Sequence, residues 1–138
     1  MPVNSTANAE WKGPLKEGGG SVQFGTFKGE FTRATRFETG GGTNPEQLIA
    51  AAHASCFSMQ LSGLLTADGH PPTSLKTKAT VTVEAGVGIT TIVLETVGDV
   101  PGIDAATFTA TAAKAKEICP VSRALAGVKD VSVKATLK

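Results

Sequence analysis

The sequence predicts an α+β fold in which strands are grouped before and after helices. Alternating apolar and polar residues mark strands near the start, in the middle and at the end of the chain. A long, clearly capped helix separates the first group from the second. Strands and helices do not alternate one by one, which argues against a doubly wound parallel sheet. A length of 138 residues fits a single domain over residues 1–138.

The composition is that of an ordinary globular protein, with 41% hydrophobic and 18% charged residues. A net charge of +1, six Phe, one Trp and no Tyr give no reason to expect nucleic acid as a partner. We expect no membrane span, because no continuous apolar run approaches the roughly 20 residues that a span needs, and the N-terminus lacks the pattern of a signal peptide. We therefore expect a cytoplasmic protein without a membrane partner, in which thiols stay reduced.

Two strands are expected in the first part of the chain, in SVQFGTF (21–27) and EFTRATRF (30–37). In the second strand, Arg33 and Arg36 would point to opposite sides, so only one of them would face a core. The glycine-rich segment ETGGGTN (38–44) has neither of the common phosphate-binding patterns, so we interpret it as a connector.

A helix then begins with clear signals. Asn44 suits the N-cap, Pro45 suits the first helical position, and Gln47 can close a capping box. The body EQLIAAAHASCFSMQLSGLLTA is small or apolar on nearly every face, which predicts burial on all sides. The helix is therefore expected to be wrapped by sheet or buried at a subunit interface.

The second half of the chain predicts further strands and helices. Asp104 follows a turn and suits the N-cap of a helix, and Pro120 begins a short second helix that stops at Gly127. The expected elements are strands at 76–84 and 88–97, helices at 105–118 and 120–127, and a last strand at 130–138.

The chain has two cysteines, and the residues alone leave their role open. Cys56 lies about three turns into the long helix, too far from its N-terminus to gain from the helix dipole. In apolar surroundings its thiol would be inert unless another element brought a cation. Cys119 suits the N-cap of the short helix, where free N–H groups favour a thiolate. Each is equally compatible with a buried structural cysteine.

Few side chains are candidates to activate these thiols. His53 lies on the same helix face as Cys56 but is more often a satisfied or solvent-facing residue. Arg123 suits a surface position, and Glu46 complements the positive end of the helix dipole. Two cysteines and two histidines match no zinc-binding spacing, so we expect no metal site.

Three short motifs, TNPE, ASCFS and CPVS, occur in this order along the chain. Together they make the chain resemble the OsmC/Ohr family of bacterial thiol-dependent hydroperoxide reductases, and the resemblance runs over essentially the whole chain. Because of His53 in AAHASCFS, the chain resembles the OsmC branch of this family. The resemblance implies an OsmC/Ohr-like fold, in which antiparallel sheets wrap long central helices in an intertwined homodimer.

The resemblance also implies a role for four residues. Cys56 matches the peroxidatic cysteine and Cys119 the resolving cysteine. Arg36 matches the arginine that stabilises the thiolate and orients the peroxide, and Glu46 matches the glutamate that holds this arginine. Helix capping alone favours Cys119 as the thiolate, but an adjacent guanidinium can outweigh burial at Cys56, so we adopt the family's order.

The implied function is a thiol peroxidase that reduces organic hydroperoxides through a Cys56 sulfenic acid and a Cys56–Cys119 disulfide. An external dithiol or a lipoylated protein would reduce the disulfide, and no metal or other cofactor is expected. We expect an apolar pocket lined by Phe57 and Met59 or by the partner subunit. The alternatives are a redox-sensing or ligand-binding protein that uses the same thiols without turnover, and a structural dimer with inert cysteines.

Overall fold

The computed structural model describes residues 1–38 and 40–138, which form two compact units. The first unit is Met1–Leu48 and the second is Ile49–Lys138. Residue 39, inside the predicted connector 38–44, lies outside the described residues. That residues 1–138 form one domain stays a prediction.

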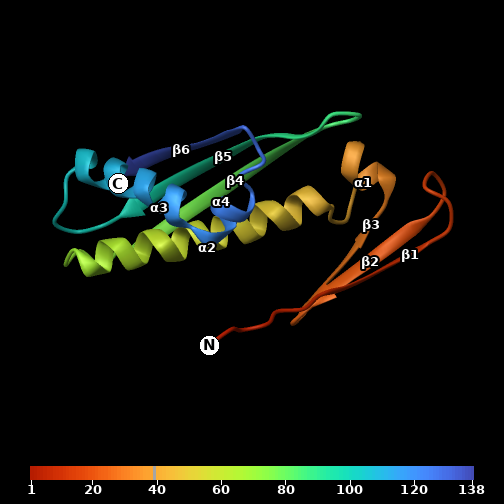
Figure 1. Ribbon diagram of the computed structural model, residues 1–138, viewed down its shortest axis with the longest axis horizontal. Helices are drawn as coiled ribbons and strands as arrows, with labels where there is room; N and C mark the ends of the chain where they lie inside the picture. Colours follow the sequence, from red (N-terminus) through yellow and green to blue (C-terminus); the bar gives the residue numbers. More distant parts are fainter. Residues whose placement is uncertain (39) are drawn as a thin grey trace. The chain divides into compact units, whose positions relative to one another are not determined.

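The first unit contains a three-stranded antiparallel sheet in the order β1-β2-β3 (Figure 1). Gly25 has a φ of 53° in the turn between the last two strands, a conformation that suits glycine. The predicted strand 21–27 therefore spans a turn, and the first strand was not predicted because every residue in it is exposed. The strands are β1 (Asn8–Lys12), β2 (Gly19–Phe24) and β3 (Phe27–Phe31).

The predicted strand 30–37 is wrong beyond Phe31, because a short helix, α1 (Arg33–Phe37), follows β3. The hydroxyl of Thr32 accepts from the backbone N–H of Thr35 at 3.1 Å, and the hydroxyl of Thr35 accepts from that of Thr32 at 2.8 Å. This reciprocal capping box gives the backbone an alternative to the sheet ladder. Arg33 and Arg36 therefore lie on a helix and not on opposite sides of a strand.

The long helix is present as predicted, as α2 (Pro45–Ala67). Asn44 caps it, because its Oδ1 accepts from the backbone N–H of Gln47 at 2.8 Å. One stripe of the helix is buried at four-residue spacing. The stripe consists of His53, Phe57, Leu61 and Leu65.

The opposite face of α2 is exposed, so the expected burial on all sides does not occur within one chain. Met59 on this face is 76% exposed. The helix is long and apolar enough by composition to cross a membrane, with a mean hydropathy of 1.4, a property that core helices of soluble proteins share. Its buried stripe packs into the core of the second unit, as such helices do.

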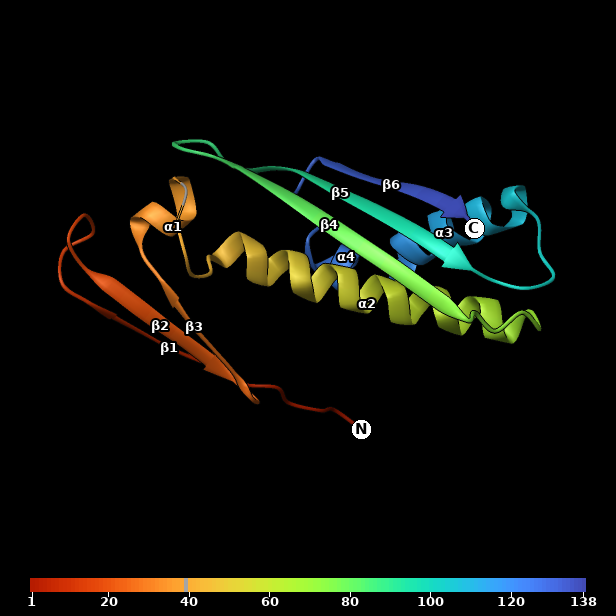
Figure 2. The same cartoon turned by 180° about the vertical axis from the view of Figure 1, so that it is seen from behind.

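The second unit has a three-stranded sheet in the order β4-β5-β6, along which α2 runs (Figures 1 and 2). The first pair is antiparallel and the second is parallel. The β5–β6 pair therefore departs from the antiparallel pairing that the resemblance implies, whereas the other strand pairs follow it. Two helices connect the parallel strands, and a crossover of this length returns the chain in the same direction. The strands are β4 (Ser74–Glu84), β5 (Gly88–Asp99) and β6 (Asp130–Leu137).

The crossover helices are α3 (Ala105–Ile118) and α4 (Pro120–Ala124). Asp104 caps α3 as predicted, with its Oδ1 accepting from the N–H of Thr107 at 2.7 Å. A core forms where α2 and α3 meet the middle of the sheet, at Leu94 of β5. Leu94 lies in register with one residue on each neighbouring strand, and both pack against the same core: Ala79 and Val133.

Candidate functional site

The two cysteines lie in direct contact, although 63 residues separate them along the chain. The Sγ atoms of Cys56 and Cys119 are 2.9 Å apart, and both thiols are free. A disulfide bond is about 2.05 Å long, so only a small movement would close it. The contact is a property of the second unit, since α2 supplies one sulfur and the α3–α4 junction the other.

Cys119 is held in place by the helices on either side of it. Its N–H donates to the carbonyl of Ala115 at 2.9 Å, as the last bond of α3, and its carbonyl accepts from the N–H of Arg123 at 3.0 Å, as the first of α4. Pro120 at the first position of α4 forces the break between the helices. The Cys119 side chain is fully buried, and Cys56 is half-buried.

The surroundings affect the two thiols in opposite directions. Burial raises the pKa of Cys56, and the hydrogen bond with Cys119 raises this pKa further. Burial also opposes ionisation of Cys119, but hydrogen bonding from Cys56 and from Ser122 outweighs it and lowers the pKa of Cys119. Within this unit the surroundings therefore favour the thiolate on Cys119 over the thiolate on Cys56.

The N-terminus of α4 contributes to this preference. As a neutral cap, the sulfur of Cys119 makes no capping hydrogen bond. As a thiolate it carries a charge that the N–H groups of Val121 and Ser122 stabilise. The lowered pKa of Cys119 agrees with the expectation from helix capping. First attack by Cys56 would instead require a cation beside its sulfur, and no cation of this unit lowers the pKa of Cys56.

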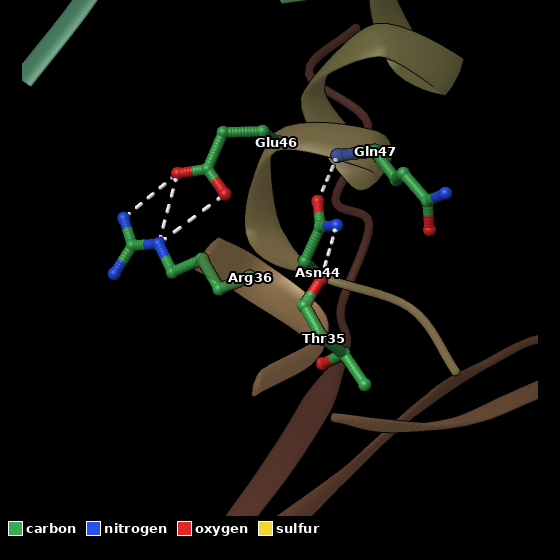
Figure 3. Close-up of polar contacts among 5 residues, drawn as sticks. All are labelled: Thr35, Arg36, Asn44, Glu46 and Gln47. Atoms are coloured by element: carbon green, nitrogen blue, oxygen red, sulfur yellow. Dashed lines mark hydrogen bonds and ion pairs between the residues drawn. The ribbon is translucent and has the colours of Figure 1, made fainter. Parts of the chain in front are cut away.

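In the first unit, the guanidinium of Arg36 is held by the carboxylate of Glu46 (Figure 3). Nη2 of Arg36 lies 2.7 Å from Oε1 of Glu46, and Nε lies 3.1 and 3.2 Å from the two carboxylate oxygens. The Glu46 side chain is only 6% exposed, whereas the Arg36 side chain is 41% exposed. Glu46 is therefore a fixed anchor, and Arg36 keeps part of its surface open to a ligand.

Asn44 connects the elements that carry this ion pair. Its amide nitrogen donates to the carbonyl of Thr35 in α1 at 2.9 Å, while its amide oxygen caps α2 (Figure 3). One side chain thereby sets the spacing between Arg36 on α1 and Glu46 in the first turn of α2. The predicted association of Arg36 with Glu46 is present, and its association with Cys56 stays a prediction.

His53 and Ser122 form a contact that the sequence did not predict. Nε2 of His53 lies 2.6 Å from Oγ of Ser122, and His53 is fully buried. The histidine is therefore bonded through Nε2 only, because its Nδ1 is buried without a hydrogen-bond partner among the described residues. Its partner, Ser122, lies in α4, three residues after Cys119. The only sequence signal for Ser122 is its position in CPVS, one helical turn after Cys119.

The expected apolar pocket is only partly present within one chain. Phe57 is fully buried in the core, so the expectation that it lines a pocket is wrong. Met59 lines an open hollow of about 530 Å³ beside Ser62 and Leu75. Among residues 1–38 and 40–138, no group of three His, Cys, Asp or Glu side chains is placed to hold a metal ion.

The fold and the site together define a two-cysteine protein of mixed α+β class. The chain belongs to the OsmC family: the family model described as OsmC-like protein matches residues 38–134. A relative from Escherichia coli (strain K12), named peroxiredoxin OsmC, is 47% identical over 133 residues, covering 91% of this chain and 92% of the relative.

Two further comparisons give the same family. An organic hydroperoxide resistance protein from Xanthomonas axonopodis pv. citri (strain 306) is 37% identical over 100 residues, covering 68% of this chain and 67% of the relative. A crystal structure from Legionella pneumophila, described as an organic hydroperoxide resistance protein OsmC, matches with a TM-score of 0.69 and 26% identity, covering 99% of both chains. The predicted fold family is therefore confirmed.

Proposed function

We propose that the protein is a cysteine-based peroxidase that reduces organic hydroperoxides to alcohols in defence against oxidative stress. The observation that carries this proposal is the 2.9 Å contact between the sulfurs of Cys56 and Cys119. Two thiols at this distance can supply the two electrons that reduce a peroxide, because they are themselves oxidised to a disulfide. The names of the relatives, peroxiredoxin and organic hydroperoxide resistance protein, support the substrate class.

The reaction proceeds in two steps. The thiolate of Cys56 attacks one oxygen of the peroxide bond, the alcohol leaves after taking up a proton, and Cys56 becomes a sulfenic acid. The sulfur of Cys119 then attacks the sulfur of Cys56, and the sulfenic oxygen leaves as water. Formation of the Cys56–Cys119 disulfide completes the oxidation, and an external dithiol restores both thiols.

Arg36 is the proposed cation for the first step. A guanidinium beside Cys56 would favour its thiolate over that of Cys119, against the preference that the second unit alone imposes. Glu46 accepts hydrogen bonds from Nε and Nη2 of Arg36, so the orientation of the guanidinium is fixed before peroxide binds.

We propose that the protein is a homodimer joined through the exposed face of α2. The face carries no charged residue, which is unusual for a solvated helix surface and typical of a subunit contact. A second copy covering it would also complete an apolar peroxide pocket at Met59. The exposed residues are Ala51, Ala52, Ser55, Met59, Gly63 and Thr66.

The reductant and the compartment follow from the chemistry. Sulfur carries the electrons, so the proposed cycle needs no metal or other cofactor, only a small dithiol or a lipoylated protein. A cytoplasmic location suits a thiol pair that must return to the reduced state after each turnover.

The experiment that tests this function is steady-state consumption of cumene hydroperoxide with dihydrolipoamide as reductant. We expect many turnovers for the native chain and none for Cys56→Ser. A redox sensor without turnover would instead consume one equivalent and stop. Full turnover by Cys56→Ser would show that the role assigned to Cys56 is wrong.

A further inference from the structure

The exposed ring of Phe37 lies beside the guanidinium of Arg36. Phe37 is the last residue of α1, and it is 43% exposed. Its ring centroid lies 5.2 Å from Cζ of Arg36, which is within the range of a cation–π contact. An apolar surface and a cation are therefore adjacent in the first unit, and both are open to a ligand.

The protein itself uses only part of the Arg36 guanidinium. Nε and Nη2 donate to the carboxylate of Glu46 at distances of 2.7 to 3.2 Å (Figure 3). Nη1 makes no hydrogen bond within the part of the chain that the structure describes. The guanidinium therefore keeps N–H donors for the oxygens of a peroxide.

Packing within the first unit does not account for the position of Phe37. No residue of α1 is buried, and over residues 1–38 and 40–138 the Phe37 ring stacks on no other aromatic ring. The ring also lies 5.8 Å from Cζ of Arg33, but that guanidinium is paired with the exposed Glu38 at 3.3 Å. A single exposed apolar side chain is ordinary on a protein surface, and what distinguishes Phe37 is its contact with Arg36.

An organic hydroperoxide needs two kinds of contact from its binding site. Its peroxide oxygens accept hydrogen bonds, whereas its organic group is apolar and is bonded directly to one of these oxygens. A site that selects organic hydroperoxides over hydrogen peroxide must therefore offer N–H donors and an apolar surface close together. Arg36 and Phe37 offer this combination on consecutive residues.

We propose that Phe37 is a specificity-determining residue, whose ring contacts the organic group of a hydroperoxide that Arg36 holds. The inference rests on the proposed peroxidase function and deepens it, because it names the residue that recognises the organic part of the substrate. Phe37 thereby supplies an apolar contact that Phe57, fully buried in the core, does not offer. The ring takes no part in the bonds that form and break, so the two reaction steps are unchanged.

This contact predicts a graded effect across peroxides with different organic groups. Cumene hydroperoxide carries a phenyl ring that can pack on Phe37, tert-butyl hydroperoxide carries only methyl groups, and hydrogen peroxide carries no organic group. Loss of the Phe37 ring should therefore matter most for the first peroxide and least for the last. A ring that only orients Arg36 would affect all three alike, since each would use the same guanidinium.

The experiment measures the second-order rate constant for the loss of each peroxide with the reduced chain. The variants are Phe37→Ala, which removes the ring, and Phe37→Leu, which keeps an apolar side chain. Phe24→Ala is the matched control, because Phe24 is 42% exposed in the same unit and its ring stacks on Phe27 at 4.9 Å. Analytical ultracentrifugation shows whether each variant keeps the oligomeric state of the native chain.

We expect Phe37→Ala to lower the rate constant roughly tenfold for cumene hydroperoxide, about threefold for tert-butyl hydroperoxide and less than about twofold for hydrogen peroxide. Phe37→Leu should restore the rate with tert-butyl hydroperoxide more fully than the rate with cumene hydroperoxide. Phe24→Ala should match the native chain with all three. A native rate with hydrogen peroxide also shows that a variant is folded and that Arg36 still acts.

The inference is overturned by any of three results. The first is a native rate with cumene hydroperoxide in Phe37→Ala, and the second is an equal fall with all three peroxides, which would make Phe37 a support for Arg36. The third is loss of the native oligomeric state in both Phe37 variants, which would place the ring in a subunit contact. All three leave the proposed function standing, whereas a native chain that consumes none of the peroxides overturns both.

Discussion

Glu46 anchors Arg36 through three contacts of 2.7 to 3.2 Å, and its own side chain is almost fully buried. The guanidinium is therefore oriented by the protein and not by its substrate. Such a fixed orientation suits a cation that stabilises a thiolate, because the guanidinium does not have to be ordered during the reaction.

Arg36→Ala should raise the pKa of Cys56 and slow its oxidation by roughly ten- to a hundredfold, because an opposite charge beside a thiolate is worth about one to two pKa units. Peptide-resolved alkylation as a function of pH measures the first effect, and single-turnover consumption of hydroperoxide measures the second. Arg33→Ala is the control, since Arg33 lies on the same short helix and pairs with the exposed Glu38 at 3.3 Å. Equal alkylation profiles for native and Arg36→Ala protein would contradict the role of Arg36.

His53 should make stability depend on pH. Burial lowers the pKa of His53 below its value in the unfolded chain, so the unfolded state binds more protons as the pH falls. The stability that neutral His53 provides is present above the unfolded pKa of about 6.5 and is lost as the pH falls toward the folded pKa. Denaturant titrations at pH 7 and pH 5 should show a smaller loss of unfolding free energy for His53→Gln than for the native chain.

An unchanged difference between pH 7 and pH 5 in His53→Gln would show that the buried imidazole is not the group responsible.

Gly98 in β5 allows the ring of Phe108 in α3 to lie directly on the sheet. A Cβ at position 98 would overlap the Phe108 ring, which is fully buried. We expect Gly98→Ala to lower the free energy of unfolding by about 1–3 kcal/mol, the usual cost of overpacking a core. Gly127→Ala, where nothing lies within 4 Å, should change stability much less. Equal stabilities of the two variants in urea would contradict this packing.

Met59 should be essential for dimerisation through α2. A charge at its position would have to be buried without a partner in the interface, so Met59→Glu should give a monomer in analytical ultracentrifugation. Val87→Glu, on a residue of similar exposure in the turn between β4 and β5, is the control and should remain a dimer. A native chain that sediments as a monomer would contradict the proposed homodimer.

Much of the fold follows from local sequence signals. Asn44, Pro45 and Asp104 mark helix starts that the structure confirms, since each signal acts within one turn of the backbone. The strand predicted at 30–37 failed because Thr32 and Thr35 cap each other, which alternation of apolar residues cannot reveal. The parallel pairing of β5 with β6 depends on the path of the crossover helices, which strand patterns do not specify.

The sequence predicted those site residues that lie in recognisable motifs, but not the contacts that form only when distant segments pack together. Cys119 was expected at a helix start, and its lowered pKa agrees with that reasoning from the residues. The contact between His53 and Ser122 joins residues 69 positions apart, so no local pattern could indicate it. The exposed face of α2 was expected to be buried, because the sequence shows small or apolar residues all round the helix but not on which side of it the sheet lies.

We expect an organic hydroperoxide to oxidise Cys56 and Cys119 together. Intact mass after one equivalent of cumene hydroperoxide tests this most directly. The native chain should lose two hydrogen atoms, whereas Cys119→Ser should gain one oxygen and, with more peroxide, a second as the sulfinic acid. An unchanged native mass, or a gain of oxygen without disulfide formation, would contradict the account.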